Sequence, residues 1–242
     1  MTSASSRASS AHATAPRAVL FDAYGTLFDV YSVAAAAEGL FPGAGERLST
    51  LWRDKQIEYT RLCSMSGRPR SFADCTRAGL RYAARRLGLA LDADSEQALV
   101  QAYDRLAPFP ENRAVLQALH ARGIRTGVLS NGDPAMLEAA VRHAGFERWL
   151  DPVLSVETTG RFKTDPATYA LGTSALGLAA AEIVFVSSNC WDAIGATWFG
   201  YTTLWVNRFD LPLDELETEP TRTGTRLTDV LDFFLLPEDP RP

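Results

Sequence analysis

Four groups of polar residues in this chain could carry chemistry. Three of them follow short apolar runs, and Lys163 lies between a weaker run and the next helical pattern. The four groups are Asp22, Ser130-Asn131-Gly132, Lys163, and Ser187-Ser188-Asn189 with Asp192. An ionised aspartate can attack carbon as a nucleophile, a second carboxylate can activate water, and a lysine can balance their charge. Each group taken alone is also an ordinary turn or helix-start sequence. The chemistry therefore requires a fold that brings the four groups together.

The apolar runs predict the strands of such a fold. They lie at residues 18–22, 124–129, 153–156, 183–186 and 201–206. Short runs that are mostly apolar are typical of buried parallel strands. Helical patterns alternate with them at residues 113–122, 134–144 and 166–176. The last two begin with a proline directly after Asp133 and Asp165, which we interpret as N-cap residues.

This alternation of strands and helices predicts an α/β fold with a doubly wound parallel sheet. Ligands of such sheets bind beyond the carboxyl ends of the strands. Three of the polar groups stand at those ends, and Lys163 lies in the segment after the weaker strand at 153–156, so we expect all four to converge on one edge of the sheet.

Residues 29–108 interrupt the alternation with a purely helical region. Helical patterns cover residues 47–65, 72–87 and 95–107. We expect a helical cap domain of residues 29–108, inserted into a core domain of residues 17–28 and 109–236. Residues 227–236 read as a packing helix, and residues 1–16, which are rich in Ser, Ala and Thr, as a disordered leader.

The bulk composition narrows the classes of partner. The chain has 242 residues and a net charge of -5, which gives no reason to expect nucleic acid or an anionic membrane surface. No apolar run is long enough to cross a membrane. The cysteines, Cys63, Cys75 and Cys190, are widely spaced and form no C-x-x-C pair. We therefore expect neither a disulfide framework nor a zinc site, and a reducing, cytoplasmic compartment.

Five segments in order carry a family resemblance. They are FDAYGTLFDVYSV (21–33), LWRDKQIEY (51–59), LSNG (129–132), K-x-D-P-x-x-Y (163–169) and FVSSNCWDAIGA (185–196). Together they resemble the haloacid dehalogenase superfamily, and most closely its L-2-haloacid dehalogenases. The resemblance implies a Rossmann-like core with an inserted cap, a homodimer, and hydrolysis of short (S)-2-haloacids to (R)-2-hydroxy acids and halide without a cofactor.

The resemblance also implies roles for individual residues. The implied catalytic residues are Asp22 as nucleophile, Asp192 with Asn189 for the water, and Thr26, Lys163 and Ser187 as supporting groups. The implied substrate-binding residues are Ser130 for the carboxylate, Arg53 and Asn131 for the halide, Tyr24 and Trp191 as apolar walls, and Tyr169. Without the resemblance, Arg53 reads as a surface arginine, and Tyr169 and Trp191 as core aromatics.

Tyr24 separates the competing functions. The resemblance implies that phosphatases of the superfamily carry the pattern D-x-D at this position. The second Asp is a general acid, and the first helps to bind magnesium. Here the pattern is Asp22-Ala-Tyr24. A tyrosine does not bind Mg²⁺ as a carboxylate does, and a halide leaves without a proton. We therefore expect no metal.

Two alternatives remain open beside the dehalogenase. One is a magnesium-dependent phosphatase acting on a small phosphate ester, and the other is a binding module without catalysis. The chain also departs from the family at two positions, with Asp54 where glutamine is expected and Thr164 where proline is expected. The halogen preference and the range of chain lengths stay open.

Overall fold

A computed structural model describes residues 15–235 of the chain. Its centre is a six-stranded, fully parallel sheet with the strand order β3-β2-β1-β4-β5-β6. The strands are β1 (Ala18–Phe21), β2 (Arg125–Ser130), β3 (Val153–Ser155), β4 (Ile183–Ser187), β5 (Thr202–Val206) and β6 (Arg222–Gly224). The order reverses direction at β1, so the crevice between β1 and β4 is the expected place for a ligand.

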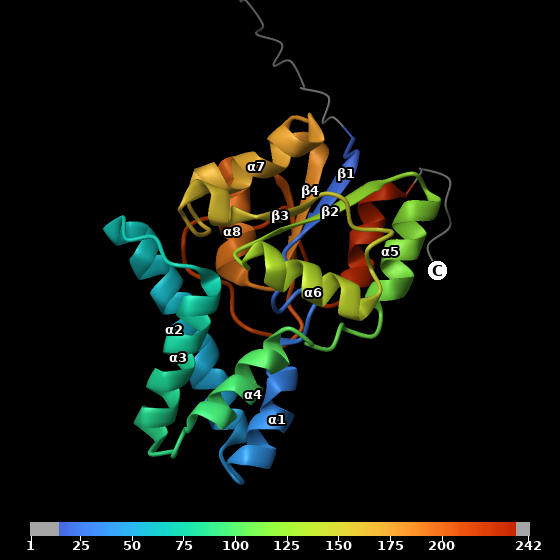
Figure 1. Ribbon diagram of the computed structural model, residues 1–242. Helices are drawn as coiled ribbons and strands as arrows, with labels where there is room; N and C mark the ends of the chain where they lie inside the picture. The colour runs from blue at the N-terminus through green and yellow to red at the C-terminus, as the bar shows by residue number, and fades with distance from the viewer. Residues whose placement is uncertain (1–14, 236–242) are drawn as a thin grey trace, which may run out of the picture.

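Helices cover both faces of this sheet. They are α5 (Asn112–Ala121), α6 (Pro134–Ala144), α7 (Pro166–Leu176), α8 (Cys190–Phe199) and the 3₁₀ helix η4 (Leu227–Phe234). The pair α5 and η4 packs together, as does the pair α7 and α8 (Figure 1). The short 3₁₀ turns η2 (Val156–Thr159) and η3 (Ala180–Glu182) complete the connections. The predicted α/β fold with a doubly wound parallel sheet is therefore confirmed.

The strand register brings the polar strand ends to one level. Phe21 at the end of β1 pairs with Val128 of β2 and with Val186 of β4. All four residues of β1 are fully buried between the helical layers. The chain can therefore place Asp22, the residue that follows β1, beside the ends of both neighbouring strands.

Four further helices form the helical region that follows β1. They are α1 (Val33–Leu40), α2 (Gly45–Ser66), α3 (Phe72–Leu87) and α4 (Ala93–Tyr103), preceded by the 3₁₀ turn η1 (Val30–Ser32). The long helices α2 and α3 pack on each other, and α1 packs on α2 and α4 (Figure 1). All four lie within the expected cap range 29–108, on the side of the sheet where the strands end (Figure 1). We refer to this helical region as the cap.

Asp133 occupies the predicted N-cap position of α6, but its side chain caps a different helix. The side chain of Asp133 makes no capping hydrogen bond to its own helix, α6. Its carboxylate instead accepts hydrogen bonds from the backbone N–H groups of Phe72 and Ala73, at 2.7 and 2.8 Å. Asp133 therefore caps α3, a helix of the cap that precedes it by about 60 residues, because the fold presents that helix end to the carboxylate.

Other elements differ from prediction in smaller ways. The sequence did not predict β6, which is three exposed or half-buried residues without an apolar pattern. The segment predicted as a packing helix is the 3₁₀ helix η4, which buries Leu227 and Val230. Residues 1–14 of the expected leader lie outside the described residues. Among residues 15–235, no helix is both long and apolar enough to cross a membrane.

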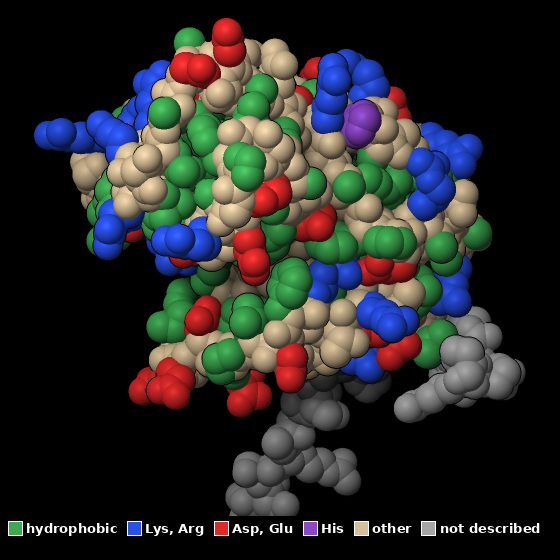
Figure 2. Space-filling view, turned by 90° about the horizontal axis from the view of Figure 1, so that it is seen from below, with side chains coloured by type: hydrophobic (Ala, Val, Ile, Leu, Met, Phe, Trp, Pro, Cys, Tyr) green, Lys and Arg blue, Asp and Glu red, His purple; other side chains and the backbone are tan. Residues whose placement is uncertain are grey.

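The molecular surface carries mixed charge. On the face seen from below, basic and acidic side chains alternate with apolar and neutral groups (Figure 2).

Candidate active site

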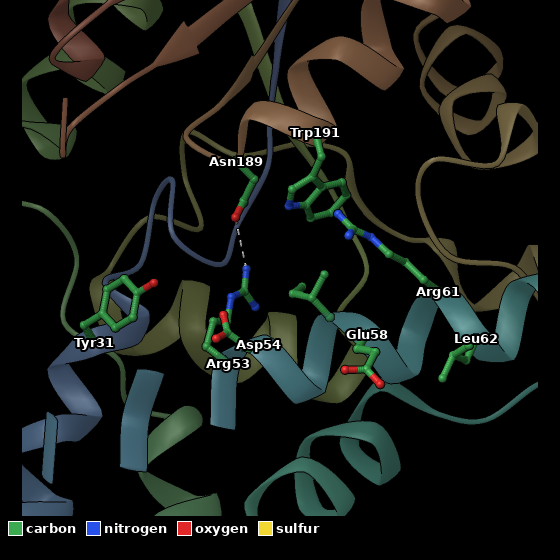
Figure 3. Close-up of a pocket in the computed structure, with 9 residues that line it drawn as sticks. Tyr31, Arg53, Asp54, Glu58, Arg61, Leu62, Asn189 and Trp191 are labelled. Carbon is green, nitrogen blue, oxygen red and sulfur yellow. Dashed lines mark hydrogen bonds between the residues drawn. The ribbon is translucent and has the colours of Figure 1, made fainter. Parts of the chain in front are cut away.

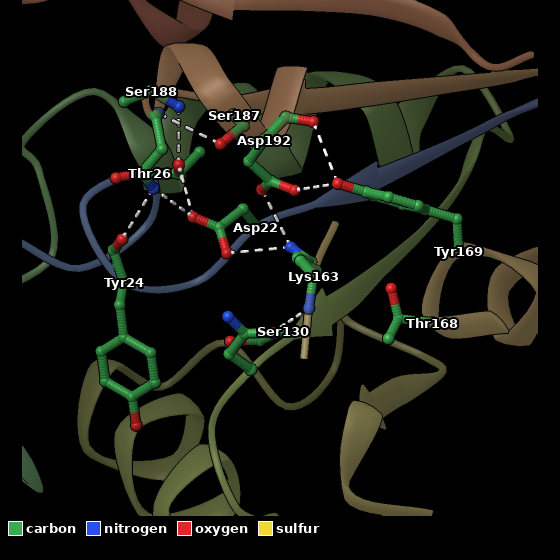
Figure 4. A network of polar contacts seen from close by, with 12 residues as sticks. Asp22, Tyr24, Thr26, Ser130, Lys163, Thr168, Tyr169, Ser187, Ser188 and Asp192 are labelled. Carbon is green, nitrogen blue, oxygen red and sulfur yellow. Dashed lines mark hydrogen bonds and ion pairs between the residues drawn. The ribbon is translucent and has the colours of Figure 1, made fainter. Parts of the chain in front are cut away.

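Asp22 lies at the centre of a network of polar contacts at the sheet edge (Figure 4). Its backbone N–H donates to Val186 O at 2.9 Å, which ties it to β4. Lys163 Nζ donates to Oδ1 at 3.1 Å. Thr26 Oγ1 and Asn189 Nδ2 donate to Oδ2 at 3.1 and 2.9 Å. Three donors therefore converge on one carboxylate and fix its oxygen atoms in place, and a carboxylate held in this way can act as a nucleophile.

Lys163 joins Asp22 to a second carboxylate. Its Nζ lies 2.9 Å from Asp192 Oδ2 and packs 4.8 Å from the centroid of the Phe185 ring. Lys163 and Asp192 are both buried, so water does not screen the pairs. The three charges sum to -1, and hydrogen bonds from the neutral donors Thr26, Asn189 and Tyr169 stabilise the excess negative charge.

Asp192 is the group of the network whose protonation responds most clearly to burial. It lies in the first turn of α8, is fully buried, and accepts a hydrogen bond from the Tyr169 hydroxyl at 2.8 Å. Burial raises the pKa of Asp192 to about 6, although the neighbouring Lys163 opposes the rise. A carboxyl with a pKa near neutrality is suited to accept a proton from water.

Tyr169 reaches Asp192 because α7 and α8 approach closely. At Gly195 of α8, an added Cβ would lie 2.6 Å from both Tyr169 Oη and Thr164 Cγ2. Only glycine leaves room for this approach. Burial raises the pKa of Tyr169 well above its ordinary value, so the phenol keeps its proton and donates a hydrogen bond to Asp192.

Asn189 joins the network to the cap. It occupies the N-cap position of α8 but makes no side-chain capping bond there. Its Nδ2 donates to Asp22 and, at 3.2 Å, to Tyr24 O, while its Oδ1 accepts from Arg53 Nη2 at 3.3 Å. Ser187 Oγ in turn accepts from the backbone N–H of Asn189 at 3.1 Å. Ser187 therefore supports Asn189 and has no hydrogen bond to Asp22 in the described part of the chain.

The end of β2 supports Lys163 through its backbone. Asn131 Oδ1 accepts from the backbone N–H of Lys163 at 2.9 Å. Ser130 Oγ accepts from the backbone N–H of Gly132 at 3.2 Å. Both serine and asparagine are buried beside the network. The structure thus brings Ser130 and Asn131 to the site, and their expected roles in binding carboxylate and halide stay predictions.

Arg53 reaches the site from α2 of the cap. It is 7% exposed, and its Nη2 donates to Tyr24 O at 3.1 Å as well as to Asn189 Oδ1. Its Nη1 donates to Gln56 Oε1 at 2.7 Å. Arg53 is therefore a buried residue of the site, and the alternative of a plain surface arginine is wrong.

An open pocket of about 600 Å³ lies beside Arg53, between α2 and the start of α8 (Figure 3). Its lining residues are Tyr31, Arg53, Asp54, Ile57, Glu58, Arg61, Leu62, Asn189 and Trp191. Trp191 faces the pocket under the guanidinium of Arg61, 5.0 Å from the ring centroid. Asp54, one of the two departures from the family pattern, also lines the pocket, so its charge acts on any anion that enters.

Tyr24 contributes to the site chiefly through its backbone carbonyl. Its ring stacks on Phe72 of the cap with centroids 5.2 Å apart. Its hydroxyl is buried, has no hydrogen-bond partner among the described residues, and points away from Asp22 (Figure 4). Burial raises the pKa of Tyr24 far above the ordinary value, so the hydroxyl stays neutral. Its expected role as an apolar wall stays a prediction.

Sequence reasoning missed two residues behind Arg53. Gln56 and Thr76 are fully buried and join Arg53 to the α2–α3 contact. Gln56 stands three residues after Arg53 on the same helix, and this spacing places the two side chains on one face. That spacing was the available signal. The contact with Thr76, 20 residues further on, had no signal in the sequence.

Comparisons with known proteins agree with this geometry. Residues 16–200 match the family model described as haloacid dehalogenase-like hydrolase. The chain is 44% identical over 218 residues to the (S)-2-haloacid dehalogenase of Pseudomonas sp. (strain YL), covering 90% of this chain and 94% of that protein.

Two solved structures are similar over nearly the whole chain. The L-2-haloacid dehalogenase RSc1362 is 53% identical with a TM-score of 0.89, covering 91% of this chain and 99% of the other. The L-2-haloacid dehalogenase of Xanthobacter autotrophicus with chloropropionic acid covalently bound is 36% identical with a TM-score of 0.85, covering 90% and 98%. The chain therefore belongs to the haloacid dehalogenase superfamily and, within it, to the L-2-haloacid dehalogenases.

Proposed function

We propose that this protein hydrolyses short-chain (S)-2-haloacids to (R)-2-hydroxy acids and halide. The observation that carries the proposal is the Asp22 carboxylate, which three donors hold next to a pocket that contains a buried arginine. Such a carboxylate is ready to attack an electrophilic carbon, and the arginine can hold an anion beside it. Similar proteins that bear the name (S)-2-haloacid dehalogenase support the substrate class.

In the first step, Asp22 displaces the halide. A carboxylate oxygen of Asp22 attacks C2 of the substrate from the side opposite the halogen. The carbon–halogen bond breaks with its electron pair, halide leaves, and C2 inverts. The product of this step is an ester between Asp22 and the hydroxy acid. No proton is transferred, which suits a site in which Tyr24 is neutral and directed away from Asp22.

In the second step, water hydrolyses the ester. Water attacks the carbonyl carbon of Asp22, and Asp192, aided by Asn189, orients it and accepts its proton. The bond from that carbon to the hydroxy acid oxygen breaks, and this oxygen takes the proton. The second proton of the water, which is left on the Asp22 carboxyl, is released to solvent, and Asp22 returns as a carboxylate that carries one oxygen from water. Thr26, Lys163, Ser187 and Tyr169 hold the two carboxylates in place during both steps.

The substrate is held by groups of both regions. In this proposal Ser130 binds the substrate carboxylate, and Arg53 with Asn131 receives the halide. Tyr24 and Trp191 enclose the alkyl group. The reaction requires no metal and no cofactor, because Lys163 already places a positive charge between the two carboxylates. Among residues 15–235, no group of three or more acidic, cysteine or histidine side chains is arranged to hold a metal ion.

Chloride release tests the proposal directly. The protein is incubated with (S)-2-chloropropanoate, with and without EDTA, and chloride is measured. Release that EDTA does not inhibit is the expected result, and the Asp22→Asn variant should lose turnover. Absence of chloride release, together with magnesium-dependent release of phosphate from p-nitrophenyl phosphate, would make the protein a phosphatase. Full activity of Asp22→Asn would remove Asp22 as the nucleophile.

Isotope labelling tests the ester. In a single turnover in H₂¹⁸O with excess enzyme, the oxygen of the hydroxy acid should come from Asp22, and the label should appear in the protein. Label found directly in the product would indicate attack of water on C2.

The proposal includes three coarser features of the protein. Residues 17–28 and 109–236 act as the core domain and residues 29–108 as the cap domain. The active form is a homodimer in the cytoplasm, which rests on the family resemblance and on the three cysteines, all free. Size-exclusion chromatography with light scattering measures the oligomeric state. A monomer at assay concentration would contradict the proposed homodimer.

A further inference from the structure

The guanidinium of Arg53 is held only by neutral oxygen atoms. Its acceptors are the side-chain carbonyls of Gln56 and Asn189 and the backbone carbonyl of Tyr24, at distances of 2.7, 3.3 and 3.1 Å. Within residues 15–235, no carboxylate forms an ion pair with it. A neutral acceptor fixes the orientation of a guanidinium without cancelling its charge. The full charge of Arg53 therefore remains available to an anion in the pocket.

The orientation of the Gln56 amide follows from its other neighbour. Thr76 Oγ1 lies 2.8 Å from Phe72 O, which can only accept, so the hydroxyl proton of Thr76 is committed to that bond. Thr76 Oγ1 must then accept from Gln56, and the contact at 2.6 Å is with Nε2. The amide therefore turns its Oε1 towards Arg53. The hydrogen bond from Thr76 to Phe72 O therefore sets the direction of the bond between Gln56 and Thr76. That bond in turn sets which atom of the Gln56 amide faces Arg53.

Burial gives this chain of bonds its importance. Gln56 and Thr76 are both fully buried, so water cannot replace a lost partner. Thr76 is further held through its carbonyl, which accepts from Trp52 Nε1 at 2.7 Å. Phe72, at the start of α3, is bound by Asp133 of the core. The orientation of Arg53 therefore depends on the contact between α2 and α3.

We propose that Gln56 is a positioning residue, which Thr76 orients so that the buried Arg53 keeps both its direction and its uncompensated positive charge for the anion of the reaction. The inference rests on the proposed function, because that function assigns the leaving halide to Arg53. A merely structural Gln56 would join α2 to α3 and leave anion binding unchanged. The positioning role and the structural role predict different effects on anion binding when a carboxylate replaces the amide at position 56.

The first test replaces the neutral acceptor by a charged one of nearly the same shape. In Gln56→Glu the introduced carboxylate forms an ion pair with Arg53 and cancels its charge. Bromide affinity, measured by quenching of tryptophan fluorescence and by product inhibition, should fall at least about 10-fold. The exposed residue Gln101 on α4 provides a matched control. Gln101→Glu adds the same charge to the cap and should leave bromide affinity unchanged.

The second test removes the orienting bond and restores it. Thr76→Val keeps the shape but loses the hydroxyl, and it should weaken bromide binding about 3-fold to 10-fold. Thr76→Ser keeps the hydroxyl and should recover most of that loss. Circular dichroism melting of each variant establishes that it is folded. If Gln56→Glu and Thr76→Val melt earlier but bind bromide as the unchanged protein does, Gln56 is structural and the inference is wrong.

The outcome separates this inference from the proposed function. If the unchanged protein releases no chloride from any short haloacid, the function fails, whatever bromide binding shows. If it releases chloride while Gln56→Glu retains full kcat/KM and full bromide affinity, the function stands and the positioning role fails.

Discussion

The core side and the cap side of the site use charge differently. On the core side, Asp22, Lys163 and Asp192 are buried and lie within 3.1 Å of their charged partners. On the cap side, Arg53 is the charged contributor to the network, and neutral oxygens hold it. The core charges are balanced mainly against each other, while the cap charge is left for a ligand. We infer that the sheet edge carries the bond-making groups and the cap supplies anion recognition.

The two sides are also anchored differently. Asp22 directly follows β1, and Asp192 lies in the first turn of α8, after the paired strand β4. Lys163 lies in the loop before α7, where Asn131, after the end of β2, accepts from its backbone N–H. The positions of the core groups therefore depend on the paired strand ends. The cap meets the core through fewer polar contacts. These include Asp133 with the start of α3, and Ser64 Oγ, which accepts from the Phe162 N–H at 2.7 Å. Changes on the core side should therefore abolish chemistry, and changes on the cap side should weaken binding.

The largest effect is expected from Asp192→Asn on the core side. Loss of the base should lower turnover about 10²-fold to 10⁴-fold, because the ester can form but is hydrolysed slowly. Intact-protein mass spectrometry should then find the ester on Asp22. The fold should persist, because the change removes one of three buried charges without leaving Lys163 unpaired. Normal turnover with no trapped ester would contradict the assignment of Asp192.

Arg53→Met tests the cap side. Loss of the buried cation should lower kcat/KM about 10²-fold, with a large rise in the inhibition constant of bromide. Arg148 offers a control, since it is an exposed arginine stacked 4.2 Å from the centroid of a tryptophan ring, that of Trp149. Arg148→Met should change neither quantity. If Arg53→Met instead lowers only turnover and traps the ester, the division between the two sides is wrong.

The pH dependence tests the raised pKa of Asp192. Below pH about 6 its carboxyl is protonated and cannot accept the proton of water. In the ester, Asp22 has lost the charge that helps to raise the pKa of Asp192, so this pKa is lower there. Ester hydrolysis should fall about 10-fold for each pH unit below that lowered pKa. If Asp192 controls the pH profile of ester hydrolysis, other titratable groups change that profile less than Asp192 does. A rate of single-turnover ester hydrolysis that stays constant as the pH is lowered until the protein unfolds would contradict this role.

Stability should move in the opposite direction over the same pH range. The folded-state pKa of Asp192, about 6, is above its ordinary value of 3.8. The folded protein therefore binds this proton more tightly than the unfolded chain does. This contribution to the free energy of unfolding is complete below pH about 4 and is lost as the pH rises through 6, by an amount on the order of 3 kcal/mol. The difference between the unchanged protein and Asp192→Asn in urea unfolding measures it.

The smallest effect is expected from Asp133→Ala, which removes a contact between the two sides. The free energy of unfolding should fall by about 1–2 kcal/mol, because the N–H groups of Phe72 and Ala73 lose their acceptor, while the capping bond from the Asp74 N–H to Ser71 remains. KM should rise a few-fold and amide exchange in residues 72–87 should quicken, since the cap is held less firmly. Asp92 provides the control, because it accepts from the Ser95 N–H at 2.8 Å and caps α4 entirely within the cap.

Asp92→Ala should also lower the melting temperature but leave KM unchanged. If Asp92→Ala and Asp133→Ala affect KM equally, the contact between cap and core has no particular role in binding.

Proline and glycine residues at the ends of helices allowed the sequence to predict the first and last residues of some elements. The bounds of α6 and α7 agree with prediction because proline begins each helix and glycine follows each end. The strand ends were predictable because apolar runs stop at polar residues. The edge strand β6 was not, since a short exposed edge has no apolar pattern to mark it. The partners of the Asp133 side chain were not predictable either, because the sequence Asp-Pro marks the start of α6 but does not indicate which helix the carboxylate caps.

The sequence by itself determined which side chains stand at the strand ends, and hence that Asp22, Lys163 and Asp192 could share one edge. It also determined, through Tyr24, that a second carboxylate is missing two residues after Asp22. Only the tertiary structure decided the partners. Lys163 is 141 residues from Asp22 in the chain, and Asn189 is 167.

The physical reason is that local pattern and long-range contact carry different information. Periodicity and turn chemistry act over a few residues, so they are written in the sequence. Burial, the direction of a hydrogen bond and the rise in the pKa of Asp192 depend on what packs around each group, which only the folded chain specifies. The neutral acceptors around Arg53 belong to this second kind.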